Sequence, residues 1–231
     1  MEHMLNNNQP VSVEQVYRDM RNRILKLELK PGEKISENQM CQEYDASRFI
    51  IRNVFNRLNQ LELLTVYPQR GTYVSLIDLH YIEDLLVLRS AVEKEVLYEI
   101  FTKIKESNRL SLIKKLESNL EMQEHYRNLK LYDRGYMKLD SQFHKIIVDS
   151  VNRYRLVEIL ENPMLHITRW RNVDVSLTHR ISELIEEHRA IVNAIKDNDL
   201  ERAQHSIAKH LSSISTLADL AKEKYPEYFT K

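Results

Sequence analysis

Apolar residues recur at helical spacing along most of the chain, which predicts a mostly α-helical protein. The first helix is expected over residues 12–27. A second begins at Ser36, which forms a capping-box pair with Gln39, and runs to about residue 44. Ser47 caps a third helix. The buried stripe expected on that third helix consists of Ile51, Val54, Phe55, Leu58 and Leu61.

A different pattern follows these helices. The runs 64–67 and 72–76 are β-prone, and they flank a Pro68-Gln69-Arg70-Gly71 turn that places Arg70 at a hairpin tip. Two short helices joined at a turn and followed by a hairpin are the pattern of a winged helix-turn-helix. The sequence therefore predicts this motif over 36–74.

The third helix carries hydrogen-bond donors on the side opposite its apolar stripe. Arg48, Arg52 and Asn56 fall there, one turn apart. Arginine pairs bidentately with guanine and asparagine suits adenine, so these residues can read bases or clamp phosphates. Spacing alone fits a solvated helix face equally well, because charges one turn apart are common on helix surfaces.

The remainder of the chain reads as helical, since only three Gly and five Pro occur and few are left for further hairpins. We expect an antiparallel bundle of six or seven helices. The predicted domains are a winged helix-turn-helix over 11–77 and an all-helical domain over 78–231. The expected bundle helices cover 79–105, 110–129, 132–151, 152–162, 164–172, 181–196 and 200–224.

Composition adds little evidence for a particular partner. The formal net charge is zero, and from 36 to 77 four Arg balance four acids, so bulk charge gives no support for nucleic-acid binding. The single cysteine, Cys41, suits a reducing compartment. No signal peptide or membrane span is apparent, and we therefore expect a cytoplasmic protein with no membrane partner.

Four residues of the predicted bundle form a candidate metal site. Asp140 and His144 lie four positions apart and share one helix face, while His188 and His210 fall on the apolar faces of two later helices. Such a set can bind Zn, Ni or Mn with open coordination positions. The alternative is that each histidine is a hydrogen-bonded core residue, which is the commoner role of a single His on an apolar face.

An arginine, Arg89, interrupts the apolar stripe of the helix at 79–105. A buried charge needs a partner, and Glu93 is available one turn away. Alternatively, Arg89 binds the carboxylate of a small effector. His166, Arg169 and Trp170 can line the same pocket, or they can occupy surface or core positions.

The N-terminal segment LKPGEKISENQMCQEYDASRFIIRNVFNRLNQLELLTVYPQRGTYV resembles the DNA-binding domain of the GntR family of bacterial transcription regulators. The resemblance implies DNA contacts by Arg48 and Arg52, and a wing tip at Arg70 and Gly71 that enters the minor groove.

Ser36, Ser47 and Asn56 complete the set of residues expected at the DNA interface. Two positions depart from the family pattern. Asn38 stands where family members often carry Arg, which removes one DNA contact, and Ile50 stands in place of a Pro, which alters the operator sequence rather than the fold.

The segments DSQFHKIIVDSVN and EHRAIVNAIKDNDLERAQHSIAKHL resemble the metal-binding branch of the FCD effector domain, which defines the FadR subgroup of that family. Asp140, His144, His188 and His210 fall on the four ligand positions of that branch. Arg89 and Glu93 match its R-x-x-x-E pattern, which implies effector binding.

The expected function is that of a bacterial transcription regulator, a repressor and not an enzyme, that binds a palindromic operator in double-stranded DNA as a homodimer. A small carboxylate bound near the metal would release it from DNA. The alternatives are a metal-dependent enzyme, a regulator that responds to the metal alone, and a helical interaction module.

Overall fold

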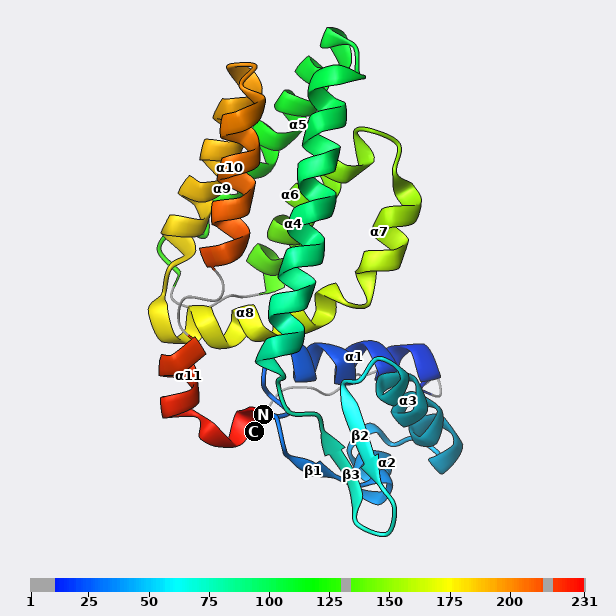
Figure 1. Ribbon diagram of the computed structural model, residues 1–231. Helices are drawn as coiled ribbons and strands as arrows, with labels where there is room; N and C mark the ends of the chain where they lie inside the picture. Colours follow the sequence, from blue (N-terminus) through cyan, green and yellow to red (C-terminus); the bar gives the residue numbers. More distant parts are fainter. Residues whose placement is uncertain (1–10, 130–133, 214–217, 231) are drawn as a thin grey trace. The chain divides into compact units, whose positions relative to one another are not determined.

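The computed structural model describes residues 11–129, 134–213 and 218–230, and it is mostly helical (Figure 1). The chain divides into two compact units, one ending at Leu76 and the other beginning at Ile77. This division falls where the β-strands end and the long helices begin.

Three helices of the N-terminal unit begin at serine caps. These helices are α1 (Val13–Leu25), α2 (Glu37–Tyr44) and α3 (Arg48–Gln60). The hydroxyls of Ser12, Ser36 and Ser47 each accept a hydrogen bond from the backbone N–H three residues later. Helix α2 ends at Asp45, whose left-handed backbone (φ 48°) directs the chain into α3.

A small antiparallel sheet completes this unit, with strands β1 (Lys34–Ile35), β2 (Leu64–Tyr67) and β3 (Gly71–Val74) in the order β1-β3-β2. The sequence predicts only the β2–β3 hairpin. Strand β1 escapes prediction because two residues are too few to show an alternating pattern. Gly71 has φ +109°, a conformation that strains other residues, so glycine is needed where β3 begins.

The core of the N-terminal unit lies between α1, α3 and the sheet. The apolar stripe predicted for α3 is buried at Ile51, Val54, Phe55 and Leu58, whereas Leu61 forms the helix C-cap and is only half-buried. Met20 and Ile24 of α1 are fully buried on the facing side. This packing leaves the opposite side of α3 exposed.

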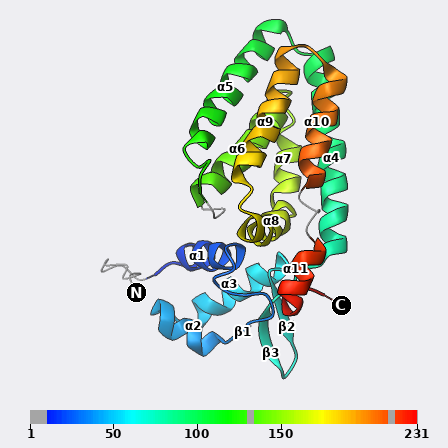
Figure 2. The same cartoon turned by 90° about the vertical axis from the view of Figure 1, so that its left-hand side faces the viewer.

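The C-terminal unit is an all-helical bundle, as the sequence predicts. Helix α8 runs across one end of the longer helices, as both views show (Figures 1 and 2). The helices are α4 (Leu79–Thr102), α5 (Glu106–Glu124), α6 (Arg134–Asp149), α7 (Tyr154–Glu161), α8 (Met164–Thr178), α9 (Ile181–Lys196), α10 (Leu200–Ser212) and α11 (Ala218–Lys224).

Several predicted boundaries differ from the structure. The helix expected over 110–129 is Glu106–Glu124, and the other helix ends mostly shift by two or three residues. The helix expected over 200–224 is described as α10 and α11, and the residues between them, 214–217, lie outside the described part of the chain. Helix α8 continues to Thr178, six residues beyond the predicted end at 172, because no proline or glycine stops it there.

The main core of the bundle is formed by α4, α5, α6, α9 and α10. Its fully buried members include Leu97, Leu116, Phe143, Ile191 and Ile207, one from each helix. Helices α9 and α10 pack against each other and α10 packs against α4. The core therefore holds α6, α9 and α10 in fixed register.

The chain after α11 returns to the start of this unit. The Ile77 N–H donates to the Tyr228 carbonyl at 2.8 Å, and the Thr230 N–H donates to the Ile77 carbonyl at 3.0 Å. Phe229 is buried and packs edge-to-face on Trp170 of α8, with ring centroids 5.9 Å apart. Residues 228–230 thus form a parallel bridge with the residue that follows the N-terminal unit.

Candidate metal centre and nucleic-acid interface

The exposed side of α3 presents the donors predicted from the sequence. Arg48, Arg52 and Asn56 are all exposed there. Phe49 lies on the same helix with 76% of its surface exposed, although the sequence pattern did not mark it as a candidate. An arginine and asparagine face with an exposed aromatic side chain is suited to contact with base edges and backbone sugars.

Arg52 is positioned by the first turn of α2. Its Nε and Nη2 atoms donate to the two carboxylate oxygens of Glu37 at 3.1 and 3.0 Å. This fork-to-fork pair lowers the pKa of Glu37, foremost through its hydrogen bond with Arg52. The guanidinium stays largely exposed, so the pair orients Arg52 without burying it.

Ser36 and Ser47 serve as helix caps. The Ser36 hydroxyl accepts from the Gln39 N–H at 3.1 Å, and the Ser47 hydroxyl accepts from the Ile50 N–H at 3.4 Å. Both serines are exposed at helix N-termini, where the remaining N–H groups and the helix dipole favour a phosphate.

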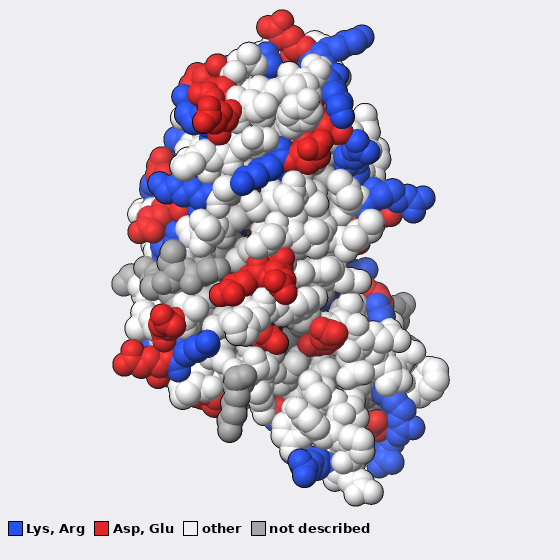
Figure 3. All heavy atoms as spheres, viewed as in Figure 1, with Lys and Arg blue, Asp and Glu red and all other residues white. Residues whose placement is uncertain are grey.

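Arg70 is exposed in the turn between β2 and β3, next to Gly71. On the face drawn in Figure 3, basic side chains lie on both sides of the hairpin at the bottom of the view. Acidic and basic side chains are interspersed over the upper part of that face, and the charged side chains near its middle are mostly acidic. The basic groups near the wing are therefore local and do not reflect an excess of charge in the whole chain.

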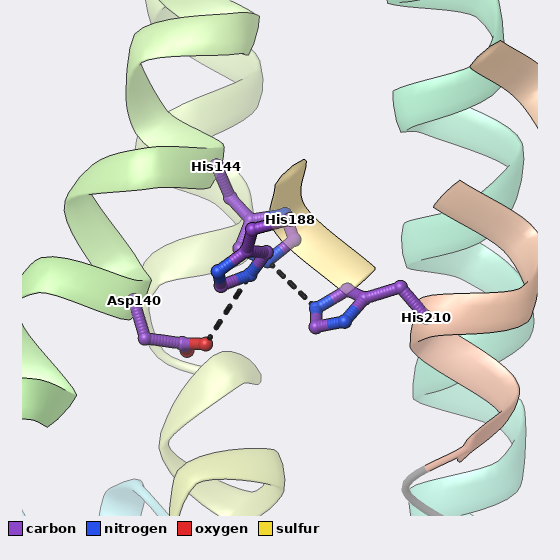
Figure 4. Close-up of side chains that lie close together, drawn as sticks. All are labelled: Asp140, His144, His188 and His210. Atoms are coloured by element: carbon purple, nitrogen blue, oxygen red, sulfur yellow. Dashed lines mark hydrogen bonds and ion pairs between the residues drawn. The ribbon is translucent and has the colours of Figure 1, made fainter. Parts of the chain in front are cut away.

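The four candidate metal ligands come together inside the C-terminal unit (Figure 4). Asp140 and His144 project from α6, His188 from α9 and His210 from α10, and all four side chains are buried. One ligand atom from each lies within 4.8 Å of the others. The Nε2 atoms of His144 and His210 are 3.2 Å apart, and His188 Nε2 is 3.6 Å from an oxygen of Asp140.

Each histidine is oriented by an acceptor at its other ring nitrogen. The Nδ1 atoms of His144 and His210 lie 2.7 and 2.8 Å from the carboxylates of Glu93 and Glu187, respectively. We assign the ring proton to Nδ1 in both cases, since an ionised carboxylate only accepts.

His188 Nδ1 lies 2.9 Å from Oε1 of Gln123. The Gln123 amide donates to Asn119 at 2.7 Å, and Asn119 donates to the Leu139 carbonyl at 3.2 Å, which fixes Oε1 as the acceptor toward the ring. The His188 proton therefore also lies on Nδ1, and its buried Nε2 has no hydrogen-bond partner among the described residues.

With these assignments, the unprotonated Nε2 atoms of the three histidines and the carboxylate of Asp140 all face one point. Burial lowers the pKa of all three imidazoles, so they are neutral and cannot donate through Nε2. Converging lone pairs of this kind repel one another unless a cation lies between them. The residues thus fit a divalent metal ion with mixed imidazole and carboxylate ligands.

Two arginines stand beside this set. Arg171 of α8 donates to Asp140; burial opposes the charge of that carboxyl, but Arg171 foremost holds its pKa well below the usual range. Arg89 donates to Glu93 at 2.7 Å. Burial likewise opposes the charge of Glu93, but His144 and Arg89 outweigh it and lower its pKa to about 2. The intrahelical pair considered for Arg89 is therefore present.

A cavity of about 400 Å³ opens beside the metal ligands. Arg89, Glu93, Asp140, His144 and Arg171 all line it, so the ion pair of Arg89 does not remove this residue from the pocket. A volume of this size accommodates a small organic ligand. The rest of the lining comes from α6, α7 and α8 and consists of Ser141, Lys145, Val148, Val157, Leu160, Glu161, Met164, Leu165, Ile167 and Thr168.

The three residues of α8 proposed from the sequence do not line this cavity. His166 stacks edge-on against Tyr81, Trp170 contacts Phe229, and Arg169 is buried elsewhere. Thr168 and Arg171 line it instead. Met164, Thr168 and Arg171 share one face of α8 by helical spacing. The prediction missed this face because it selected His166, Arg169 and Trp170 by residue type rather than by spacing.

Known protein families match both units. The family described as bacterial regulatory proteins, gntR family, matches residues 12–74, and the FCD domain matches residues 84–213. The transcriptional repressor RspR of Escherichia coli K12 is 26% identical over 231 residues, which cover 100% of this chain and 99% of RspR. The transcriptional regulator LutR of Bacillus subtilis is 25% identical over 205 residues, 81% of this chain and 92% of LutR.

Solved structures share the fold. A GntR transcriptional regulator from Rhodococcus sp. RHA1 superposes with a TM-score of 0.71 at 19% identity, covering 90% of this chain and 97% of that one. McbR/YncC of E. coli gives a TM-score of 0.67 at 17% identity, with 93% and 99% covered. Within the described residues, no helix has both the length and the apolar character needed to cross a membrane.

Proposed function

Because the chain belongs to the GntR family of bacterial transcription regulators, in the FadR-like subgroup with an FCD domain, we propose that it is a repressor controlled by a metal-assisted effector site. DNA-binding regulation is the function of the family, and its members are not enzymes. In this proposal residues 11–77 bind DNA and residues 78–231 bind the effector and dimerise, in the cytoplasm.

The observation that carries the effector part of the proposal is the convergence of four lone pairs beside a cavity. Asp140, His144, His188 and His210 would hold a divalent ion such as Zn, Ni or Mn. A bound ion supplies a Lewis acid for a ligand carboxylate. Arg89 lies at the same cavity and would give that carboxylate a second, charge-assisted contact.

The DNA part of the proposal assigns roles to the exposed residues of α3 and the hairpin. Arg48, Arg52 and Asn56 would enter the major groove and Arg70 with Gly71 the minor groove, while the N-termini capped by Ser36 and Ser47 would meet phosphates. One recognition helix per chain favours a homodimer on a palindromic operator, because two-fold symmetry matches the half-sites.

The test is selection of DNA by the purified full-length protein from a genomic or random pool, with an Arg48→Ala, Arg52→Ala double variant in parallel. Enrichment of one short palindrome by the parent alone supports the proposed interface. Equal enrichment by the double variant refutes it. Retention of metal by the parent, and its loss in a His188→Ala variant that remains folded, tests the ligand set.

Regulation by the ion alone is the second candidate. The same ligand set favours it, because a divalent ion would by itself neutralise the repulsion between the four ligands. Addition and removal of Zn²⁺ without any organic acid, followed by measurement of operator affinity, separates the two. The cavity beside the ligands favours the organic effector, since a sensor of metal alone needs no space there.

A further inference from the structure

The cavity beside the metal ligands has two chemically different ends. Helix α6 contributes Asp140, His144 and Val148 at intervals of one turn, so a line of cavity residues runs along one face from polar to apolar. Asp140 and Val148 are eight positions apart, which is about 12 Å along the helix. A ligand with a polar head at Asp140 would therefore have its other end near Val148.

Apolar side chains from α7 and α8 line the same cavity. Val157 and Leu160 belong to α7, and Met164, Leu165 and Ile167 belong to the start of α8. These side chains offer no hydrogen bonds. The hydroxyls or second carboxylate of a polar acid would lose water against these side chains, which weakens binding. Lys145, the cation on the same helix as Val148, is exposed and already paired with Asp149 at 3.0 Å.

The charges of the cavity favour an anion once a metal is bound. Three cationic residues, Arg89, Lys145 and Arg171, line it together with three anionic ones. Arg89 and Arg171 are buried and balance the buried Glu93 and Asp140, whereas Lys145 and Glu161 are exposed and balance each other. A divalent cation therefore leaves an excess of positive charge at the metal end of the cavity. One carboxylate compensates part of this excess and can reach both the ion and an arginine.

We propose that the effector is a monocarboxylate with an aliphatic or aromatic tail, whose carboxylate meets the metal and Arg89 and whose tail lies along Val148, Val157 and Leu160. This proposal rests on the proposed function, because it takes the metal-assisted cavity as the effector site. It adds the chemical class of the ligand and the wall that selects it.

The test compares organic acids by calorimetric titration into the full-length protein supplied with Zn²⁺. Hexanoate, adipate and gluconate have the same number of carbons and differ in a second carboxylate or in hydroxyls. Hexanoate is expected to bind most tightly, and affinity is expected to rise by about fourfold for each methylene from butyrate to hexanoate. Tighter binding of adipate or gluconate, no gain with tail length, or no binding of any acid would overturn the proposal.

Variants of α7 locate the tail. Leu160→Asn is expected to weaken hexanoate binding by about tenfold, since it removes a buried apolar contact. Ile159→Asn is the matched control, because Ile159 is the neighbouring residue with 66% of its surface exposed and it does not line the cavity. Val157→Thr, which preserves shape, tests the same wall if Leu160→Asn does not fold. Equal loss in variant and control would contradict the assignment.

The calorimetric series is independent of DNA, so its outcome is separable from that of the proposed function. Hexanoate binding with the expected selectivity, but without any change in operator affinity, would support the ligand class and refute its role as effector. Operator release by gluconate but not by hexanoate would support an effector site and refute the ligand class.

Discussion

Gln123 provides a sharp test of how the metal site is built. Its Oε1 accepts from His188 Nδ1 at 2.9 Å, and its amide donates to Asn119 at 2.7 Å. Gln123→Met keeps the length of the side chain and removes both hydrogen bonds. The His188 ring would then lose the acceptor that fixes its tautomer and orientation, although every metal ligand remains in place.

The expected magnitude follows from the roles of these two hydrogen bonds. Loss of a partner that orients a ligating histidine costs about 10- to 100-fold in metal affinity, or about 1.4 to 2.7 kcal/mol. Gln123 is fully buried, so leaving Asn119 without this donor also destabilises the metal-free fold, by about 1 to 3 kcal/mol. The two costs are measured separately.

Metal affinity is measured by competition with a chelator of known strength, and the stability of the metal-free protein by denaturant unfolding. Gln204→Met is the matched control, because Gln204 donates a part-buried hydrogen bond to the Lys94 carbonyl and, among the described residues, is not hydrogen-bonded to a metal ligand. This control should lower stability without changing metal affinity. Parental affinity for Zn²⁺ in Gln123→Met would refute the assignment of the His188 proton to Nδ1.

Three further outcomes are expected. Arg48→Ala and Arg52→Ala should each cost about 1 to 3 kcal/mol of specific operator binding, measured by fluorescence anisotropy against the selected palindrome; unchanged affinity of both would remove them from the interface. Gly71→Ala should destabilise the N-terminal unit by about 1 to 3 kcal/mol in denaturant unfolding, because its φ is +109° and the new Cβ would lie 3.0 Å from the Lys34 side chain; a neutral effect would mean that the turn relaxes. Arg89→Met should weaken the effector response more than operator affinity, in the same anisotropy assay with hexanoate added; an unaltered response would restrict Arg89 to its pair with Glu93.

The sequence predicts elements whose signal is local. The stripe of α3 and the serine caps depend on residues within a few positions, and the structure buries or bonds them accordingly. Strand β1 is different, since Lys34 and Ile35 are strand residues only because β3 pairs with them. No short window of sequence contains that information.

The residues of the candidate site also divide into those that local spacing predicts and those that depend on tertiary packing. Helical spacing accounts for Asp140 beside His144 on α6 and for His188 and His210 on the apolar faces of two later helices, and the resemblance assigns all four to one ligand set. Neither gives Gln123, whose contact with His188 spans 65 positions and depends on how α5 packs against α9. Partners across packed helices are set by tertiary structure, so they become visible only once the helices are placed.

The bridge between Ile77 and residues 228–230 has a consequence for biosynthesis. The ribosome completes Ile77 early, yet its two backbone partners are made only after almost the whole of the C-terminal unit. A contact between such distant positions forms late, because closing a long loop carries an entropic cost before any contact offsets it. The backbone of Ile77 therefore stays without these two hydrogen bonds during most of synthesis and gains them in the last stage of folding.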